Sequence, residues 1–274
     1  MAYYVYYFLT TPYNTYLLQL PKSHQILRQI NFVSNLQKVP LIEELPKGFM
    51  SVRTGKRSFS WRPDKGASLT YVTALDSGDP SKKVDFRDEV YELNYPFLGQ
   101  GKFILKTINR FSGIDWGTKD MAIAYDTWWN TRNRKSYVFN PSNPNIKPKI
   151  ISDRNYQDTY SDPGNFLRSR NEFNRSVLKM HYGNIFLRGQ GFSPSGQFPF
   201  IDKVNTKTFE KTRVYQSNYT DKIESIIDYD PKKNQLTVSI ESQSENPNYY
   251  TKKIKYGKLC LLNTSPTPRD RQKS

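Results

Sequence analysis

The chain has 274 residues, enough for one or two domains, and its 41 Lys and Arg against 25 Asp and Glu give a formal net charge of +16. Only 36% of the residues are hydrophobic, yet 15% are Phe, Trp or Tyr, which argues against disorder because disordered chains are poor in aromatic residues. A single cysteine, Cys260, excludes an internal disulfide framework and a cysteine-based zinc site. Two distant histidines, His24 and His181, do not indicate a metal centre, so we expect no metal and no cofactor.

The N-terminal residues 1–9 are rich in tyrosine and show no helical period, which predicts a strand. They lack the positive region and the small-residue cleavage site of a signal peptide, so the sequence does not indicate in which compartment the protein lies. No stretch approaches the ~18 apolar residues of a transmembrane helix, so we expect no membrane association.

A pattern of an apolar residue, a small polar residue and an aromatic, followed by a polar turn and an alternating strand, occurs three times along the chain. Its aromatic residues are Trp61, Trp116 and Tyr229, spaced by 55 and 113 residues, and the second interval is close to twice the first. After each turn we expect three further strands, separated by clusters of Pro, Gly, Asn and Asp that favour tight turns.

Four strands in ~40–55 residues are typical of a β-propeller blade. We therefore expect an all-β fold, a partial β-propeller of about four to five four-stranded antiparallel blades, with a β-sandwich as the alternative. One domain over residues 1–262 would hold the blades, and residues 263–274 would form a disordered tail. Residues 165–176 could form a short helix or a loop. The expected blades are residues 1–47, 58–107, 113–152, 176–216 and 226–262.

Candidate catalytic groups are sparse. The segment Gly191–Ser195 resembles a nucleophile elbow, but Pro194 follows the serine and has no N–H for an oxyanion, so it predicts a hairpin turn. The acidic cluster of Asp85, Asp88 and Glu89 is expected in solvated turns and strand edges, because Lys and Arg lie close by. We predict no catalytic residues.

The pair Trp128-Trp129, followed by Arg132, is the most unusual motif. Adjacent residues on a strand face opposite sides, so one tryptophan can pack between blades while the other lines a loop or groove. Trp128, Trp129 and Arg132 are therefore the candidate ligand-binding residues, and packing alone is the alternative.

Several long motifs in one order resemble the propeller of the prolyl oligopeptidase family of serine peptidases, in its glutamyl-endopeptidase-like branch. The resemblance runs from about Tyr3 to Leu262, although Thr11 stands where the family usually has an arginine. The motifs are Ser51–Arg57, Ser60–Asp64, Ala74–Pro80, Phe86–Asp88, Ile114–Gly117, Trp128–Arg132, Tyr160–Gly164, Glu241–Ser242 and Asn246–Tyr250.

The resemblance implies a propeller that covers the active site of an α/β-hydrolase domain, filters substrates by size and contributes to peptide binding. The sequence holds no Gly-x-Ser-x-Gly motif and no histidine after His181, so the Ser-Asp-His domain of that family is not expected here and the chain alone is predicted to be inactive. The expected partners are a peptide substrate or a chain that carries the missing blades and the hydrolase domain.

The leading hypothesis is thus a truncated, non-catalytic propeller fragment of a peptide-hydrolysing enzyme, retaining its substrate-gating and peptide-binding part. A stand-alone binding propeller for acidic peptides or protein partners is the alternative. A basic nucleic-acid-binding protein is a second alternative, which requires the positive charge to gather on one face. Because basic residues are spread through predicted turns and strand edges, we do not expect a nucleic-acid partner.

Overall fold

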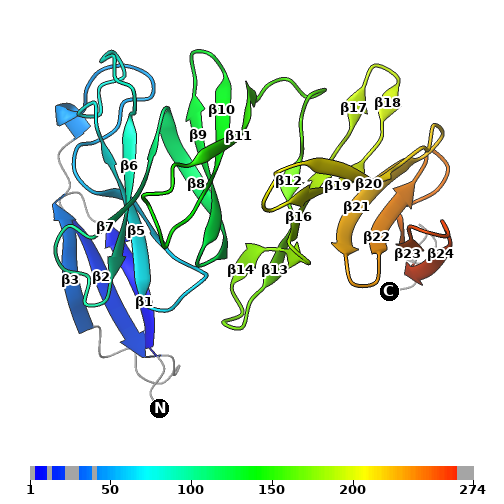
Figure 1. The fold of residues 1–274 in the computed structure, drawn as a ribbon, viewed down its shortest axis with the longest axis horizontal. Coiled ribbons are helices and arrows are strands. Elements are labelled where there is room, and N and C mark those ends of the chain that lie inside the picture. The colour runs from blue at the N-terminus through cyan, green and yellow to red at the C-terminus, as the bar shows by residue number, and fades with distance from the viewer. Residues whose placement is uncertain (1–3, 11–13, 22–30, 39–41, 264–274) are drawn as a thin grey trace, which may run out of the picture. The chain divides into compact units, whose positions relative to one another are not determined.

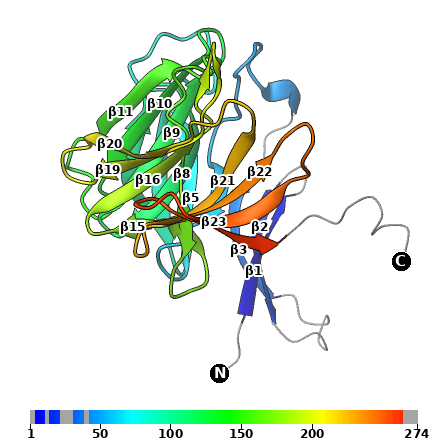
Figure 2. The same cartoon turned by 90° about the vertical axis from the view of Figure 1, so that its right-hand side faces the viewer.

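The computed structural model describes residues 4–10, 14–21, 31–38 and 42–263. In these residues the fold is all-β, with one short 3₁₀ helix, η1 (Ile42–Glu44), and no helix that is long and apolar enough to cross a membrane. The chain divides into two compact units, residues 1–155 and 156–274, which are described separately (Figure 1; Figure 2).

The first unit consists of three antiparallel sheets in which each strand pairs with its neighbour in the chain. The first sheet has β1 (Tyr4–Thr10), β2 (Asn14–Pro21) and β3 (Asn31–Lys38). The second has β4 (Arg57–Trp61), β5 (Ser68–Ala74), β6 (Asp88–Asn94) and β7 (Lys102–Thr107). The third has β8 (Arg110–Thr118), β9 (Met121–Trp128), β10 (Asn133–Phe139) and β11 (Lys149–Asn155).

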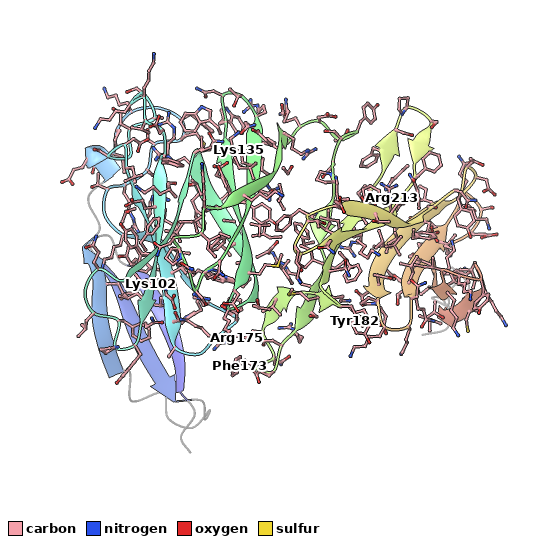
Figure 3. The ribbon with its side chains drawn as sticks, in the orientation of Figure 1. Lys102, Lys135, Phe173, Arg175, Tyr182 and Arg213 are labelled. Atoms are coloured by element: carbon pink, nitrogen blue, oxygen red, sulfur yellow. The ribbon has the colours of Figure 1, made fainter. Side chains whose placement is uncertain are left out.

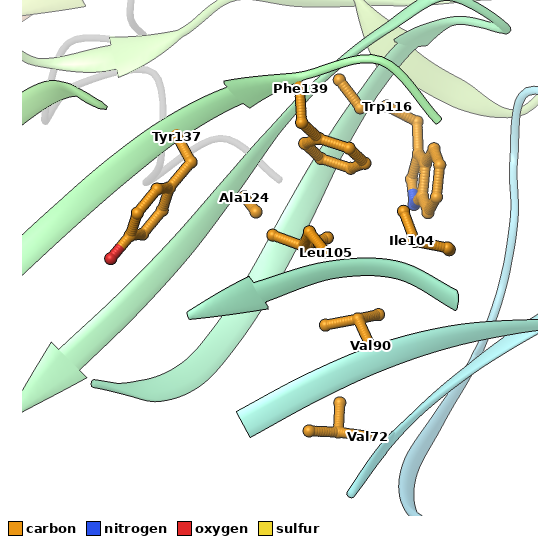
Figure 4. Close-up of a cluster of buried hydrophobic side chains, with 9 residues drawn as sticks. Val72, Val90, Ile104, Leu105, Trp116, Ala124, Tyr137 and Phe139 are labelled. Atoms are coloured by element: carbon orange, nitrogen blue, oxygen red, sulfur yellow. The ribbon is translucent and has the colours of Figure 1, made fainter. Parts of the chain in front are cut away.

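The β4–β7 sheet contributes to two hydrophobic clusters in this unit. One joins it to the β8–β11 sheet through nine buried residues, Val72, Val90, Ile104, Leu105, Trp116, Ala122, Ala124, Tyr137 and Phe139 (Figure 4). The other joins it to β3 and holds Leu36, Leu69, Tyr71, Leu93 and Phe97. Sheets that stack face to face, with aromatic residues filling the space between them, are what a propeller requires of neighbouring blades.

The second unit holds two larger sheets and two small hairpins. One sheet is built from β12 (Asn165–Phe166), β15 (Met180–His181), β16 (Asn184–Gly189), β19 (Phe200–Asn205) and β20 (Lys211–Gln216). The other is built from β21 (Ile223–Asp230), β22 (Gln235–Glu241), β23 (Asn248–Lys253) and β24 (Leu259–Asn263). The hairpins are β13 (Arg168–Arg170) with β14 (Ser176–Leu178), and β17 (Phe192–Ser193) with β18 (Gly196–Gln197).

The core of the second unit lies between its two larger sheets. It contains Leu167, Phe186 and Ile201 on one side and Ile226, Tyr229, Leu236, Val238 and Ile240 on the other. The repeated aromatic positions Trp116 and Tyr229 are thus core residues, and Trp61 packs against the cluster around Tyr71.

The expected all-β fold and several of the expected four-stranded antiparallel sheets are confirmed. The short helix considered for residues 165–176 is wrong, because this segment forms β12, β13 and the turn before β14. The blade count and the single domain over residues 1–262 stay predictions, and no sheet in the described ranges closes on itself. Of the predicted tail, Asn263 ends β24 and residues 264–274 lie outside the described residues.

Candidate functional site

The three candidate ligand-binding residues lie at one end of the β9–β10 hairpin. Trp128 is the last residue of β9 and is half-buried, whereas Trp129 lies in the turn and its residue surface is 42% exposed. Arg132 closes the turn with a positive φ of 54°, and its backbone N–H donates to the Trp129 carbonyl over 3.1 Å. The strand thus ends at Trp128, which is half-buried, and the turn leaves Trp129 more exposed.

Each indole ring lies against an arginine. The Arg132 Cζ lies 3.6 Å from the centroid of the Trp129 ring, and the Arg132 Nη1 also donates to the Trp129 carbonyl over 2.9 Å. Phe49 packs on the same indole with ring centroids 4.7 Å apart. On Trp128 the Arg87 Cζ lies 4.0 Å from the ring centroid. We call Phe49, Arg87, Trp128, Trp129 and Arg132 the Trp–Arg surface.

A buried network of charges supports the Trp–Arg surface from below. Arg87 Nη1 donates to Asp76 Oδ2 over 2.8 Å, and Arg110 donates to both oxygens of Asp76 over 2.9 and 2.8 Å. Arg110 Nη1 also lies 3.1 Å from Asp88 Oδ1. Because Asp76, Asp88 and Arg110 are all buried, these bonds fix the position of Arg87 on Trp128.

The start of β10 is held by a further buried carboxylate, Asp126. Its oxygens accept hydrogen bonds from the Tyr137 hydroxyl over 2.5 Å and from the backbone N–H of Asn109 over 2.9 Å. Burial raises the pKa of Asp126, although these hydrogen bonds act in the opposite direction. The amide of Asn109 also reaches Asn133, the residue after Arg132, over 2.9 Å. The hairpin that presents Trp129 is therefore anchored on its inner side.

Exposed apolar side chains lie beside the Trp–Arg surface in sequence. Leu75, Val84 and Phe86 all belong to the segment that joins β5 to β6, and Phe86 directly precedes Arg87. Phe49 is itself largely exposed. An exposed set of aromatic and arginine side chains is the composition that protein and peptide interfaces favour.

The serine of the elbow-like motif lies in the β17–β18 hairpin. Ser193 Oγ is 3.0 Å from Ser195 Oγ and donates to the Gly196 carbonyl over 3.0 Å, so this hydroxyl is engaged inside its own turn. His181 lies against Tyr182 in a different hairpin, with tilted rings whose centroids are 4.2 Å apart, and His24 lies outside the described residues. Within the described part of the chain, no group of three His, Cys, Asp or Glu could hold a metal ion.

The buried charges were not predicted from the sequence, and the prediction for one acidic residue was wrong. Asp88 was expected in a solvated turn or edge, but it is fully buried between Arg57 and Arg110. Glu224 and Lys252 form a comparable buried pair in the second unit, with Lys252 Nζ 3.0 Å from Glu224 Oε1, and the half-buried Tyr215 donates to Glu224. Glu224 lies in register with Ile240, a core residue, so the alternation of side chains along paired strands places Glu224 on the core side of its sheet.

No protein-family model matches the chain. Two curated proteins named probable glutamyl endopeptidase, chloroplastic, from Oryza sativa subsp. japonica and Arabidopsis thaliana, are 34% and 32% identical to it over 235 residues. The chain is similar to part of the glutamyl endopeptidases. The matched residues make up 80% of this chain but only 25% and 24% of these glutamyl endopeptidases, so the chain spans about a quarter of their length. The resemblance predicted from the motifs is thereby confirmed.

Solved structures that align with the chain are more distant in sequence. The alignment with a prolyl endopeptidase covers 97% of this chain and 34% of the prolyl endopeptidase chain, with a TM-score of 0.46 and 11% identity. The alignment with oligopeptidase B from Trypanosoma brucei covers 92% of this chain and 31% of the oligopeptidase chain, with a TM-score of 0.43 and 10% identity. The alignment with TolB from Acinetobacter baumannii covers 96% of this chain and 53% of the TolB chain, with a TM-score of 0.40 and 12% identity.

Proposed function

We propose that this chain is the propeller segment of a glutamyl-endopeptidase-like serine peptidase, and that it binds and gates peptides without cleaving them itself. The similarity to the glutamyl endopeptidases supports the peptidase context. The observation that carries the binding role is Trp129, an exposed indole that contacts Arg132 and Phe49 on an anchored hairpin.

The chemistry of this surface fits an acidic peptide. Tryptophan and arginine dominate the binding energy of many interfaces, because a rigid indole offers a large apolar face and a guanidinium pairs with carboxylates. Arg132 lies on the indole with its charge at the surface, so a peptide that packs on Trp129 would meet a positive group at the ring. The net charge of +16 attracts acidic peptides over a longer range.

The first prediction concerns Trp129. In Trp129→Ala, binding of an acidic peptide with blocked termini is expected to weaken about tenfold or more, because removing an aromatic anchor from an interface costs at least ~1.4 kcal/mol. Fluorescence anisotropy of a labelled peptide measures this affinity, and a thermal melt verifies that the variant is folded.

Tyr182→Ala is the matched control. Tyr182 is 91% exposed at the tip of the β15–β16 hairpin in the second unit, so this change also removes a surface aromatic (Figure 3). We expect it to leave peptide affinity unchanged. Equal affinities of the wild-type chain and Trp129→Ala would refute the binding role, and cleavage of the peptide by the purified chain would refute the absence of catalysis.

A further inference from the structure

Two of the contacts in the Trp–Arg surface come from segments that are not part of a strand. Phe49 lies in a turn before β4, and its ring centroid is 4.7 Å from that of Trp129. Arg87 directly precedes β6, and its Cζ lies 4.0 Å from the centroid of the Trp128 ring. Side chains on loops are positioned less precisely than those on strands unless other contacts hold the loop. The position of both side chains therefore depends on what holds these two segments.

One buried side chain, Arg110 at the start of β8, reaches both segments. Its Nε donates to the carbonyl of Met50, the residue after Phe49, over 3.0 Å. Its Nη1 and Nη2 donate to the two oxygens of Asp76 over 2.9 and 2.8 Å, and Asp76 Oδ2 also accepts from Arg87 Nη1 over 2.8 Å. Arg110 and Asp76 are both buried. The same guanidinium is thus bonded to the segment of Phe49 directly and to Arg87 through Asp76.

Asp76 also connects the two segments through the backbone. Its Oδ1 accepts the Gly78 N–H over 2.9 Å, and the Gly78 carbonyl accepts the Val52 N–H over 3.1 Å. Gly78 has a positive φ of 77°, and a Cβ there would lie 1.9 Å from the Val52 carbonyl oxygen, so the two backbones are in contact. Met50 has a positive φ of 74°, which residues with a Cβ disfavour, and the bond from Arg110 stabilises this conformation. The turn after β5 and the segment before β4 are therefore held together.

We propose that Arg110 and Asp76 are positioning residues that hold the partners of the two indoles in place before a ligand binds. That the ligand is a peptide rests on the proposed function. Both positioning residues are buried, so they act through Phe49 and Arg87 and do not touch the ligand. Side chains that are already fixed lose less conformational freedom on binding, which strengthens association. Loosening the ion pair should therefore weaken binding although no contact with the ligand is removed.

The main test variant is Arg110→Lys. The lysine keeps a positive charge beside Asp76 and Asp88, but one ammonium cannot replace the guanidinium that reaches the Met50 carbonyl and both oxygens of Asp76. Affinity for the labelled acidic peptide is expected to fall about tenfold, because two side chains must then be ordered on binding. In a Trp129→Ala background, the same change should weaken binding by less than it does alone, because one of the positioned indoles is gone.

A spectroscopic measurement reports on the indoles without any peptide. The sequence has four tryptophans, so the 274-residue chain labelled with 5-fluorotryptophan should give four resonances in fluorine NMR, assigned by replacing one tryptophan at a time with Phe. In Arg110→Lys the resonances of Trp128 and Trp129 are expected to shift. Those of Trp61 and Trp116, which pack in the hydrophobic clusters, should stay in place.

Arg62→Lys is the matched control, because Arg62 is also buried, also lies against an indole and also bonds to carboxylates. It pairs with Asp64 and Glu92, and its Cζ lies 4.1 Å from the centroid of the Trp116 ring. This change is expected to shift the Trp116 resonance and to leave both indoles of the Trp–Arg surface and the peptide affinity unchanged. If it weakened binding as much as Arg110→Lys does, a general effect on the fold would explain both losses and the proposal would be refuted.

Asp76→Asn is a second variant, which keeps the size of the side chain but removes the charge that pairs with Arg87 and Arg110. It should produce the same pattern of shifts and a similar loss of affinity. A thermal melt checks that each variant is folded. If neither variant folds, the ion pair is required for the fold as a whole, and a role specific to the Trp–Arg surface is overturned.

The two measurements separate this inference from the proposed function. Shifts at Trp128 and Trp129, with no peptide binding by the wild-type chain, support the positioning role and contradict the binding role of the surface. Unshifted resonances in a folded Arg110→Lys overturn the positioning role whatever the peptide affinity. Shifts of all four resonances overturn a role confined to the surface, and shifts that leave peptide affinity unchanged overturn the contribution of the ion pair to binding.

Discussion

At the scale of single residues, buried ion pairs accompany the hydrophobic core of the first unit. Arg62 and Glu92 are both buried, and Arg62 Nη1 donates to Glu92 Oε2 over 2.9 Å. Ser68 donates to Glu92 Oε1 over 2.7 Å, and Lys65 pairs with the same oxygen. The Arg62 guanidinium also lies on Trp116, with its Cζ 4.1 Å from the ring centroid. Glu92 therefore connects β6 to the turn between β4 and β5.

Removing this carboxylate should make folding less sensitive to acid. Burial acts to raise the pKa of Glu92, but hydrogen bonds from Lys65 and Ser68 and the charges of Arg62 and Lys65 outweigh it and lower the pKa below its ordinary value of 4.5. A carboxyl whose pKa is lowered by folding stabilises the fold above its unfolded pKa, and this contribution is lost as the pH falls through the folded pKa.

In Glu92→Gln, the free energy of unfolding is expected to fall by about 3 kcal/mol at neutral pH, because Arg62 and Lys65 lose a buried partner. The difference from wild type should shrink as the pH falls below about 4.5. Urea unfolding across this pH range measures both effects. Glu245→Gln breaks an exposed pair with Lys222 and should cost less than about 1 kcal/mol. A difference in unfolding free energy that stays the same at every pH would show that the charge of the Glu92 carboxylate does not contribute to stability.

The buried charges are where prediction from the sequence failed. Asp88 stands among Asp85, Glu89 and nearby lysines, a local composition typical of a solvated turn. Its burial depends on Arg57 and Arg110, which lie 31 and 22 positions away in the chain. No local window contains both partners, so no pattern of neighbours could indicate the pairing. Trp128 and Trp129 were found because the doubled indole is itself a local signal.

At the scale of elements, strands were predictable because alternation and turn residues act locally. Leu236, Val238 and Ile240 alternate with polar residues on β22, and the sequence shows this directly. The segment 165–176 was ambiguous because its strands are very short. Leu167 donates its backbone N–H to Phe186 and accepts from Lys179, contacts from distant strands that a helical period cannot reveal.

The edge strand β24 differs in charge from the edge strands β7, β11 and β20. The last strands β7, β11 and β20 each carry at least two Lys or Arg residues, which discourage pairing between sheets. β24 carries no charged residue, and Leu259, Leu261 and Leu262 on it are exposed. An uncharged edge strand with exposed leucines is a template for strand addition.

We therefore expect the chain to self-associate as its concentration rises, and Leu261→Lys to suppress this, because a charge on the edge opposes pairing. Sedimentation velocity across a concentration series measures the effect. Leu98→Lys places the same charge at an exposed leucine in the loop between β6 and β7 and should leave association unchanged. Association that persists in Leu261→Lys would locate the contact elsewhere.

At the scale of the whole molecule, the positive charge is shared by both units. Residues 1–155 hold 22 Lys and Arg against 13 Asp and Glu, and residues 156–274 hold 19 against 12, so the units carry +9 and +7. Part of this positive charge is neutralised by carboxylates in buried ion pairs, such as those of Arg62 and Arg110. Neither unit therefore dominates the basic charge.

The segment that joins the two units is the place where we expect a protease to cut. Residues 157–162 are exposed in succession, and Tyr160 in their midst is 66% exposed. Within this segment, Asp158 accepts hydrogen bonds from the backbone N–H groups of Tyr160 and Ser161, which are short-range turn contacts. Proteases need a stretch of chain that can leave its surroundings, and a segment without strand pairing provides it at low cost.

Among the described residues, brief chymotrypsin digestion is therefore expected to cut first after Tyr160, giving fragments 1–160 and 161–274 that mass spectrometry identifies. Tyr160→Ser should slow this cut without changing the melting temperature. Tyr182 supplies an internal comparison, because it is even more exposed but lies between the paired strands β15 and β16, which would have to separate before cleavage. Cleavage at Tyr182 before Tyr160 would show that the β15–β16 hairpin opens more easily than the joining segment, and that the boundary between the units is not the weakest part of the chain.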